Sequence, residues 1–354
     1  MPVVCRLLDD AGAADDAAAG WDAFVAGHPD GTFFHRAGWR QVIARGFGHR
    51  THFLRAERDG RVVGVLPLAH VRSRLFGSTL ISLPFCVYGG PLAADAEAFA
   101  ALLDAATALQ RGCGAAALEL RCLAPPPAGW LDPAAWVARG DLYATFRKPL
   151  AADDDSLLKA IPRKQRADIR KAIAHGLTAD VGRDVDAFFP IYAESVRNLG
   201  TPVFARRYFR LLLDMFGADA DVLTVRDRGT PVASVLNFYW RDEVLPYYGG
   251  GTRAARACHA NEFMYWQVMR HAAARGCRLF DFGRSKAGTG AFAFKKNFGF
   301  AAQPLTAFFH LAPGAAVPEV NPLNPKYRLF IAAWKRLPLP LANLLGPAIV
   351  RGIG

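Results

Sequence analysis

The fold is decided by two stretches of similar pattern, Thr51-His-Phe-Leu-Arg-Ala-Glu-Arg-Asp-Gly-Arg-Val-Val-Gly-Val-Leu-Pro-Leu-Ala69 and Asp221-Val-Leu-Thr-Val-Arg-Asp-Arg-Gly-Thr-Pro-Val-Ala-Ser-Val-Leu-Asn-Phe-Tyr239. Each joins two runs rich in apolar and β-branched residues through a short turn, at Asp59-Gly60 in the first and Arg228-Gly229 in the second. Glycine in such a turn supplies the positive backbone angle that a tight hairpin needs. Both stretches therefore predict antiparallel β-hairpins.

The two hairpins belong to a longer repeat. Before each of them the sequence predicts an amphipathic helix with an aromatic entry, which ends at a Phe-Gly pair where glycine can close the helix. After each hairpin come a Tyr-Gly-Gly segment, a second helix, an Arg-Gly-Cys triplet and a further strand. The matching segments are residues 34–43 and 204–213, 47–48 and 216–217, 88–91 and 248–251, 111–113 and 275–277, and 116–121 and 278–283.

This order of elements returns after roughly 160 to 170 residues, which indicates a tandem duplication. Each copy reads helix, hairpin, strand, helix, strand, and so predicts an α/β unit with a mixed sheet. We expect a first domain over residues 1–145, a second over 146–315 and a basic helical tail over 316–354. The boundary between the copies is expected in the proline-rich stretch and strand of residues 125–150.

The composition is that of a packed globular protein. Of 354 residues, 52% are hydrophobic and 21% are charged, which is too apolar for a disordered chain. The 43 lysines and arginines exceed the 31 acids, and the net charge of +12 favours nucleic acid, phosphorylated ligands or an acidic membrane face. We expect a cytoplasmic protein, because the acidic N-terminal segment is unlike a signal peptide and no apolar run is long enough to cross a bilayer. The cysteines and histidines show no metal-ligand spacing, so we expect no metal site.

A strongly basic segment precedes the second copy. Residues 159–171 hold six lysines and arginines and one acid, and helical spacing places Arg163, Arg166 and Arg170 on one face, with Lys164 on another. Guanidinium groups can grip phosphate oxygens in pairs, so this stripe predicts a surface for a pyrophosphate or a tRNA backbone. A charged face that is merely solvated is the alternative.

A glycine-rich loop follows the last strand of the second copy, in Asp281-Phe-Gly-Arg-Ser-Lys-Ala-Gly-Thr-Gly-Ala-Phe-Ala-Phe-Lys-Lys296. It superficially fits a dinucleotide fingerprint, but no helix pattern follows it, so we do not expect a nucleotide fold. We expect a mobile loop that carries Arg284 and Lys286 to the lip of a cleft, with Lys295 emerging from the next element. On a strand, Lys296 would alternate to the other face and be the weaker candidate, and a surface lysine at a strand edge is the alternative for Lys295.

The order of elements and two motifs resemble the FemAB/FemX family of tandem GNAT-like transferases. A basic helix precedes the second copy in that family, and Phe294-Lys-Lys-Asn-Phe-Gly-Phe300 matches the Phe-Lys-Lys-x-Phe motif of its last strand region. The resemblance covers residues 20–312 and is strongest to the subgroup found beside exosortase, PEP-CTERM and exopolysaccharide loci. It implies an α/β fold of two tandem GNAT-like domains.

Members of this family move an amino acid from aminoacyl-tRNA onto a cell-wall precursor. The resemblance implies an acyl or aminoacyl transferase acting on an amine or hydroxyl of a cell-envelope or exopolysaccharide precursor. The implied donor is aminoacyl-tRNA or acyl-CoA, with no tightly bound cofactor, and the acceptor can be a nucleotide-linked or lipid-linked sugar. The resemblance assigns to Lys295 the stabilisation of the oxyanion and of the leaving ribose hydroxylate, with Phe294 and Lys296 in the same motif.

Four further positions are candidates for binding substrate. Tyr88 and Tyr248 stand beside glycines at corresponding strand ends, where a ligand can approach the backbone, and the resemblance puts Tyr88 on the acceptor side. The stretch after Arg253 lacks the glycines with which acetyl-CoA transferases of this fold hold a pyrophosphate, so Arg253 would serve an anion by charge. Trp39, one turn from His35, either lines a cleft or packs in the core.

The tail is basic and amphipathic. After Glu319 it carries five basic residues and no acid, and Tyr327, Phe330, Ile331 and Trp334 follow helical spacing. This helix either packs back on the domains or lies on the anionic inner face of the cytoplasmic membrane.

Three functions remain open on these grounds. The first is the transferase, with CoA-dependent N- or O-acetylation of a glycan or small amine as its variant. The second is a non-catalytic nucleic-acid-binding protein, against which the sequence offers no recognition helix and no aromatic RNA-binding pattern. The third is a membrane-associated assembly factor for polysaccharide or PEP-CTERM proteins in which both clefts are vestigial.

Overall fold

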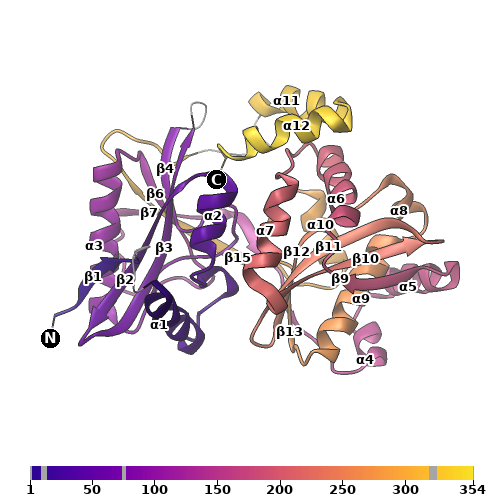
Figure 1. The fold of residues 1–354 in the computed structure, drawn as a ribbon, viewed down its shortest axis with the longest axis horizontal. Coiled ribbons are helices and arrows are strands. Elements are labelled where there is room, and N and C mark those ends of the chain that lie inside the picture. Colours follow the sequence, from indigo (N-terminus) through magenta and orange to yellow (C-terminus); the bar gives the residue numbers. More distant parts are fainter. Residues whose placement is uncertain (1, 9–13, 74–76, 319–324, 354) are drawn as a thin grey trace. The chain divides into compact units, whose positions relative to one another are not determined.

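The structure, a computed structural model, describes residues 2–8, 14–73, 77–318 and 325–353 (Figure 1). The chain forms two compact units. Unit 1 comprises Met1–Leu142, Leu305–Val320 and Arg351–Gly354, and unit 2 comprises Tyr143–Pro304 and Asn321–Val350.

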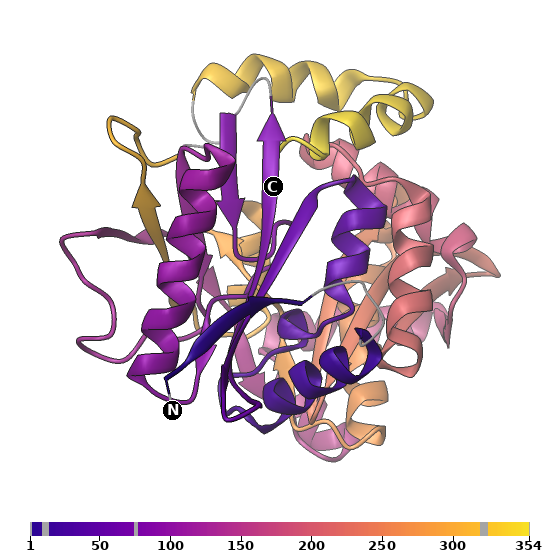
Figure 2. The same ribbon diagram turned by 60° about the vertical axis from the view of Figure 1, so that its left-hand side comes forward.

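Unit 1 is built on a mixed sheet whose strands run in the order β1-β2-β3-β4-β6-β15-β7, with β5 beside β3. The pair β4 and β6 is parallel, whereas β2–β3, β3–β4 and β6–β15 are antiparallel. Helices α1 and α2 lie on one side of this sheet and α3 on the other (Figure 2). The elements are β1 (Val4–Leu7), α1 (Ala14–Gly27), a 3-10 turn (Phe33–His35), α2 (Trp39–Phe47), β2 (Arg50–Arg58), β3 (Arg61–Ser73), β4 (Gly77–Ile81), β5 (Leu92–Ala93), α3 (Ala96–Cys113), β6 (Ala117–Arg121), β7 (Trp136–Thr145) and β15 (Gln303–Leu311).

Unit 2 has a second mixed sheet, in the order β8-β13-β12-β11-β10-β9. Here β12 and β13 form a parallel pair, and the other neighbouring strands of this sheet are antiparallel. The elements are β8 (Arg147–Pro149), α4 (Asp154–Lys159), α5 (Arg163–His175), β9 (Thr178–Gly182), α6 (Val185–Leu199), α7 (Arg206–Phe216), a 3-10 turn (Gly217–Asp219), β10 (Ala220–Asp227), β11 (Thr230–Trp240), β12 (Glu243–Gly251), α8 (Arg253–Ala257), α9 (Ala260–Ala274), β13 (Leu279–Asp281), β14 (Ser285–Lys286), α10 (Gly290–Asn297), α11 (Pro325–Arg336) and α12 (Leu339–Val350).

The predicted duplication is confirmed element by element. In unit 1, α2, the hairpin β2–β3, β4, α3 and β6 follow in the order in which α7, the hairpin β10–β11, β12, α9 and β13 follow in unit 2. Each copy has a parallel pair at the same place, between the strand after the hairpin and the strand after the second helix. The α/β class with mixed sheets is therefore as expected.

One predicted strand end is wrong. Residues 82–91 form turns instead of extending β4, and Leu83 and Phe85 have φ of +60° and +66°. The glycines of Tyr88-Gly-Gly-Pro91 suggest that the strand ends there. The chain already leaves the strand at Ser82, whose N–H donates to the carbonyl of Glu119 at 2.8 Å.

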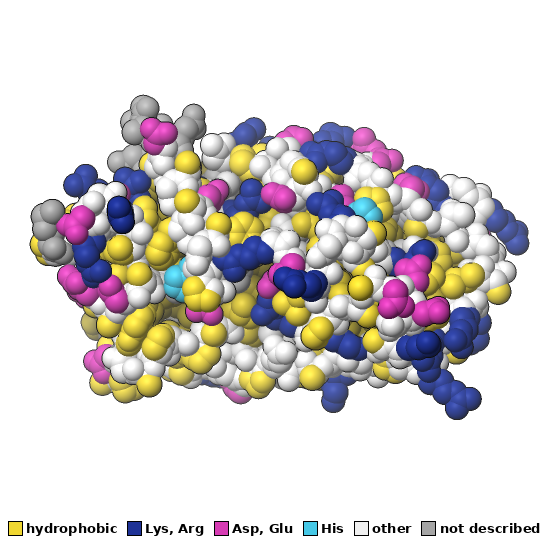
Figure 3. Space-filling model, turned by 90° about the horizontal axis from the view of Figure 1, so that it is seen from below, with side chains coloured by type: hydrophobic (Ala, Val, Ile, Leu, Met, Phe, Trp, Pro, Cys, Tyr) yellow, Lys and Arg dark blue, Asp and Glu magenta, His cyan; other side chains and the backbone are white. Residues whose placement is uncertain are grey.

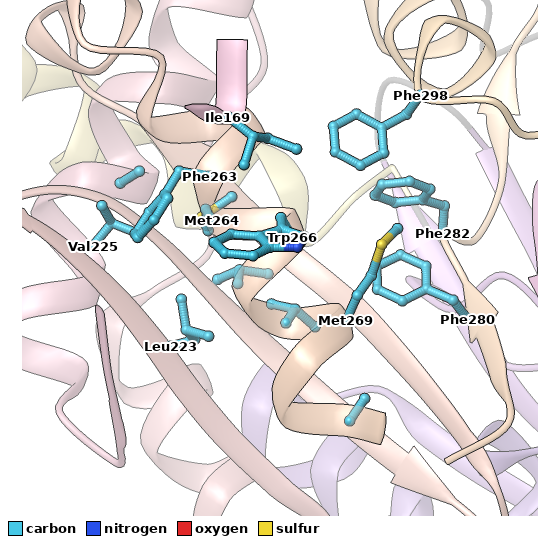
Figure 4. Close-up of a cluster of buried hydrophobic side chains, with 14 of the residues drawn as sticks. Ile169, Leu223, Val225, Phe263, Met264, Trp266, Met269, Phe280, Phe282 and Phe298 are labelled. Atoms are coloured by element: carbon cyan, nitrogen blue, oxygen red, sulfur yellow. The ribbon is translucent and has the colours of Figure 1, made fainter. Parts of the chain in front are cut away.

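The core of unit 2 is an apolar cluster between α9 and the sheet. Phe263 and Met264 of α9 lie toward Val225 and Leu223 of β10, whereas Met269 lies beside Phe280 and Phe282 (Figure 4). Ile169 of α5 closes one side of this cluster, and the rings of Phe280, Phe282 and Phe298 extend it toward β13 and the end of α10 (Figure 4). The core thus reaches the segment that carries the glycine-rich loop and the Phe-Lys-Lys motif.

We expect Phe209→Ala to lower the free energy of unfolding of unit 2 by about 3–5 kcal/mol. Phe209 is fully buried, and its ring packs edge-on against Phe188 and Tyr248 at centroid distances of 5.0 and 5.3 Å. Equilibrium urea denaturation measures the change. Arg207→Ala, an exposed position on the same helix, is the control and should change stability by about 0.5 kcal/mol or less. Equal effects of the two substitutions would contradict this packing.

Candidate functional site

Lys295 lies in helix α10, not in the strand that the motif predicts. Thr289 begins this helix, because its hydroxyl accepts a hydrogen bond from the N–H of Phe292 at 3.3 Å in the manner of an N-cap. The expectation that no helix follows the glycine-rich loop was wrong. A helix of eight residues is too short for its periodicity to be read among so many phenylalanines.

Three consecutive carbonyl groups hold the ammonium of Lys295. Its Nζ donates to the carbonyl oxygens of Phe282 at 2.6 Å, Gly283 at 3.0 Å and Arg284 at 3.2 Å. Gly283 has a φ of +63°, in the left-handed region, so the chain curls there and the three carbonyls converge. The rings of Phe146 and Phe282 lie 5.4 and 5.8 Å from Nζ. The ammonium is thus surrounded by carbonyl oxygens and aromatic faces.

Asp281 and Arg147 fix the turn that supplies these carbonyls. Asp281 ends β13 and is only 1% exposed. One of its carboxylate oxygens accepts the N–H of Gly283 at 2.6 Å, and the other lies 3.2 Å from Nε of Arg147, its neighbour in the β8–β13 ladder. Arg147 also pairs with Glu243 at the start of β12. A buried carboxylate is tolerated only with such partners, so Asp281 and its turn are held in one arrangement.

Burial lowers the pKa of Lys295 from 10.5 to about 7, and the negative charge of Asp281 opposes this by favouring the ammonium. The three carbonyl acceptors favour the charged form as well. A lysine with a pKa close to neutrality can provide a positive charge or exchange a proton at physiological pH, as groups at reaction centres do. Lys296, the next residue along the helix, is exposed.

The other candidates of this region lie close to Lys295 in the chain. The guanidinium of Arg284 lies 4.5 Å, and Nζ of Lys286 5.6 Å, from the ring centroid of Tyr143. Lys286 belongs to β14, which pairs with the end of β7, so it lies on a strand and not on a mobile loop. It is 8% exposed, and its Nζ has no hydrogen-bond partner among the residues described. Phe294 packs against Phe298, with ring centroids 5.5 Å apart.

Helix α5 carries the basic stripe as predicted from its spacing. Arg163, Lys164 and Arg170 are exposed and have no ion pair within the described ranges, whereas Nη1 of Arg166 donates to the carbonyl of Lys159 at 3.4 Å. Lysine and arginine side chains project at the end of unit 2 where α5 lies (Figure 3). Lys171 differs, since it pairs with Asp168 at 3.0 Å.

The first turn of α5 lies against the end of α10. A β-carbon at Gly299, two residues beyond α10, would lie only 2.9 Å from Cδ of Pro162, which caps α5. Beside it, Nζ of Lys148 donates to the carbonyl of Ala160 at 2.7 Å. The positive end of the α5 dipole, with Arg163 next to it, is therefore adjacent to the segment that follows Lys295.

The surroundings of Arg253 bear on whether a pyrophosphate can bind at the start of α8. Arg253 begins α8, a helix of five residues, and its backbone N–H donates to the carboxylate of Glu194 at 2.9 Å. Glu262 lies in the first turn of the next helix, α9, where burial raises its pKa. Carboxylates thus occupy the helix starts at which a pyrophosphate would otherwise accept backbone hydrogen bonds.

Three predicted contact residues are core residues. Trp39 is fully buried and its Nε1 donates to the carbonyl of Phe33 at 3.1 Å. Tyr88 is 1% exposed, and Tyr248 is 5% exposed with its hydroxyl 2.9 Å from that of Tyr208. A substrate therefore cannot reach these side chains in this conformation. The sequence pattern does not show whether these aromatic rings face the core or the solvent, and the structure places them in the core.

A cavity of about 350 Å³ lies in unit 1 beside two residues of the Tyr-Gly-Gly-Pro segment. Its walls are mostly apolar, with the ring of Trp130 on one side and His28 as a polar group. The lining residues are His28, Pro29, Asp30, His35, Gly90, Pro91, Leu92, Ala93, Ala94, Phe99, Cys122, Leu123, Ala124, Pro125, Pro126, Pro127 and Trp130.

In unit 1 the place equivalent to the Lys295 site is closed by the chain itself. Beyond their parallel pairing, β4 and β6 are bridged by residues 82–91, since Gly90 donates its N–H to the carbonyl of Arg121 at 2.9 Å. The hydroxyl of Ser82 in turn accepts the N–H of Arg121 at 2.7 Å. The two copies thus share their strands but not the group that lies where the strands part.

Sequence reasoning missed Asp281, Arg147 and Glu194 as parts of the site. The position of Asp281 at the end of a predicted strand, immediately before Phe-Gly-Arg, is the sequence feature that could have identified it. Arg147 and Glu194 lie far in the chain from the residues that they contact. The pairing of β8 with β13 brings Arg147 to Asp281, and Glu194 of α6 accepts the N–H of Arg253.

Two comparisons with known proteins bear on this arrangement. Residues 163–296 match the family model of an acetyltransferase (GNAT) domain, which spans α5 to α10 and includes Lys295. No curated protein matches the sequence.

Solved structures match over most of the chain. FemX matches with a TM-score of 0.65 and 18% identity, over 89% of this chain and 98% of its own. The C-terminal domain of a putative lysylphosphatidylglycerol synthetase from Agrobacterium fabrum matches with a TM-score of 0.56 and 13% identity, over 85% and 93%. A tandem GNAT protein of the clavulanic acid pathway gives 0.52 and 15%, over 89% and 99%. At these identities the likeness establishes the fold, which is that of two GNAT domains in tandem, as predicted.

We expect the stability difference between the wild type and Lys295→Met to depend on pH. The unfolded chain keeps the Lys295 proton up to a pH near 10.5, whereas the folded protein releases it above a pH of about 7. Between these values the unfolded state binds more protons, so the stability of the wild type relative to the variant rises as the pH is raised, and it is constant below about pH 7. Denaturant unfolding across this range measures it. A flat difference would contradict a lowered pKa, and Lys296→Met is the control for loss of a lysine.

Proposed function

We propose that the protein is an acyl or aminoacyl transferase that modifies an amine or hydroxyl of a cell-envelope or exopolysaccharide precursor, and that unit 2 holds the reaction centre. The observation that carries this proposal is Lys295, a lysine of lowered pKa held by the turn after β13 inside the region that matches a GNAT domain. Lys296 is exposed and has a minor part.

The chemistry follows from the position of the ammonium. In aminoacyl transfer, the acceptor nitrogen or oxygen bonds to the ester carbonyl carbon and the bond to the ribose oxygen breaks. The acceptor's proton passes to a base, which is either water or the amine that Lys295 becomes once it has protonated the leaving oxygen. A positive charge beside the carbonyl stabilises the oxyanion that forms. Because the pKa of Lys295 is about 7, its ammonium can also give a proton to the departing ribose oxygen. The carbonyl of Arg284, the longest of the three contacts, is the one that a substrate oxygen would replace.

We favour an aminoacyl-tRNA donor over acyl-CoA. The backbone N–H of Arg253 is already bonded to Glu194, whose charge repels a pyrophosphate, and no glycine opens the following turn. The exposed cations of α5 suit a ribose-phosphate backbone, because Arg163, Lys164 and Arg170 are not neutralised by neighbours. Acetyl-CoA-dependent N- or O-acetylation of a glycan or small amine is the second candidate, supported by the GNAT domain match.

For the acceptor, we propose the cavity of unit 1. A pocket of about 350 Å³ with an aromatic wall at Trp130 has room for a sugar-sized group. An acceptor of this kind can be carried on a nucleotide or on a lipid, and a lipid-linked one would bring the protein to the inner face of the cytoplasmic membrane.

We expect Lys295→Ala to lower kcat by about 10²–10³-fold, since one charge is lost at the oxyanion. The assay combines purified protein with charged tRNA or acyl-CoA and a panel of glycan precursors. Lys296→Ala should change kcat by only a few-fold, about the effect of an exposed lysine near a site. Transfer that does not depend on Lys295, or no transfer with any donor, would overturn the proposal. RNase-sensitive absorbance at 260 nm or thermal stabilisation by CoA identifies the donor.

We expect the triple variant R163Q/K164Q/R170Q to raise KM for the donor about tenfold or more and to leave kcat nearly unchanged, since these cations bind without reaching the reacting bond. The wild-type KM should rise steeply with salt, and the variant should lose much of that dependence. A fall in kcat at unchanged KM would instead place α5 at the reaction centre. The matched control is R45Q/R207Q/R256Q, which removes the same charge at exposed positions elsewhere.

A further inference from the structure

The C-terminal helices α11 and α12 leave an apolar surface exposed after they have packed. Five of the eleven large apolar side chains that are exposed in the described part of the chain belong to these two helices. We call them the C-terminal apolar face: Leu329 (84% exposed), Phe330 (43%), Leu341 (47%), Leu344 (72%) and Leu345 (46%). Such a concentration on two short helices marks an interaction surface.

The opposite side of the two helices is anchored to unit 2. Trp334 of α11 is 3% exposed, and Ala342, Gly346 and Val350 of α12 are buried at a spacing of four residues. A β-carbon at Gly346 would lie 2.8 Å from the carbonyl oxygen of Val203, so the helix backbone is in close contact there. Both ribbon views show the pair over α6 (Figures 1 and 2). The first alternative for the tail, packing back on a domain, therefore holds for one side of it.

The exposed side of α12 has no charge at all. Pro340, Leu341, Leu344, Leu345 and Ala348 are exposed in a row along one face of the helix, and the whole helix contains neither lysine, arginine, aspartate nor glutamate. Water-facing helix surfaces in a soluble protein are normally polar. An apolar face of this kind would be stabilised by contact with an apolar partner.

The basic residues near the C-terminal apolar face indicate which kind of partner fits it. Lys335 and Arg336 are exposed at the end of α11, where the chain turns into α12. From residue 320 to the end, the sequence carries five basic residues and no acid. The side chains of Lys326, Tyr327 and Arg328 lie outside the described part. A second copy docked through the same face would bring like charges together, whereas an anionic lipid surface offers both hydrocarbon and opposite charge.

We propose that α11 and α12 form a peripheral membrane anchor, in which the C-terminal apolar face enters the hydrocarbon boundary of an anionic bilayer and Lys335 and Arg336 contact its phosphates. Among the described residues, no helix has the length and apolar character needed to span a membrane. The helices lie in the plane of the surface and do not cross it. This inference does not rest on the proposed transfer reaction.

Vesicle flotation of the full chain tests the anchor. Wild-type protein should bind vesicles of phosphatidylcholine mixed with phosphatidylglycerol, and bind phosphatidylcholine alone much less. L341Q/L344Q should weaken binding about tenfold or more, because two leucines no longer enter the lipid. K335Q/R336Q should weaken it by a similar factor, and this loss should shrink as salt is raised.

Matched controls separate the face from general effects. Val181→Gln, at another exposed apolar position of unit 2, and R45Q/R207Q, which removes two exposed charges elsewhere, should bind as the wild type does. Circular dichroism and thermal unfolding of L341Q/L344Q should match the wild type, since both leucines are exposed. Absence of binding to anionic vesicles would overturn the anchor. So would variants that bind like the wild type, or a dimer in solution that L341Q/L344Q dissociates.

Discussion

The arrangement of unit 2 depends on one constraint, the need to compensate the charge of a lysine that burial has largely removed from water. The ammonium of Lys295 is compensated by the carbonyl oxygens of residues 282–284. The turn that carries these carbonyls is held by Asp281, which accepts the N–H of Gly283 and pairs with Arg147. Arg147 comes from β8 and Glu243 from β12, so the two strands that flank β13 both support the turn. The site is therefore a consequence of the sheet order, and a lysine at this position in another fold would have neither the turn nor the lowered pKa.

The duplication gives two units with the same strands but unequal chemistry. In each, the parallel pairing is short, and the space beyond its end is filled differently. Unit 1 fills it with its own backbone, through Ser82 and Gly90 against β6. Unit 2 fills it with a turn and a charged side chain. The first arrangement is stable by itself, whereas the second keeps a group that can respond to a ligand, and this asymmetry is why the reaction centre is assigned to unit 2 while the cavity of unit 1 is assigned to the acceptor.

The sequence predicts the fold well because the same order of elements occurs twice. A single amphipathic helix or hairpin is an ambiguous prediction, but the second copy supports the assignment of the first. The site is harder to predict. Local motifs single out Lys295 and the basic helix as candidates, yet the Phe-Lys-Lys motif predicts a strand where α10 forms, because a short helix shows too little periodicity. Trp39, Tyr88 and Tyr248 were chosen for their chemistry, but burial decides whether a ring meets substrate or core, and burial is set by tertiary packing. Arg147 and Glu194 carried no signal, since each acts through a neighbour distant in the chain.

The net charge of +12 acts in two physically different ways. The exposed cations of α5 and α11 include Arg163, Lys164, Arg170, Lys335 and Arg336. Their attraction is long-ranged, additive and weakened by salt, so they can only bring an anionic surface or backbone to the protein. Lys295 is largely removed from solvent, where a single charge has a stronger local field and a proton that leaves near neutral pH. Exposed charges therefore cannot replace it, and it cannot recruit a polyanion. In the transfer that we propose, Lys295 would act where the bond breaks, and the exposed charges would set how often a donor arrives.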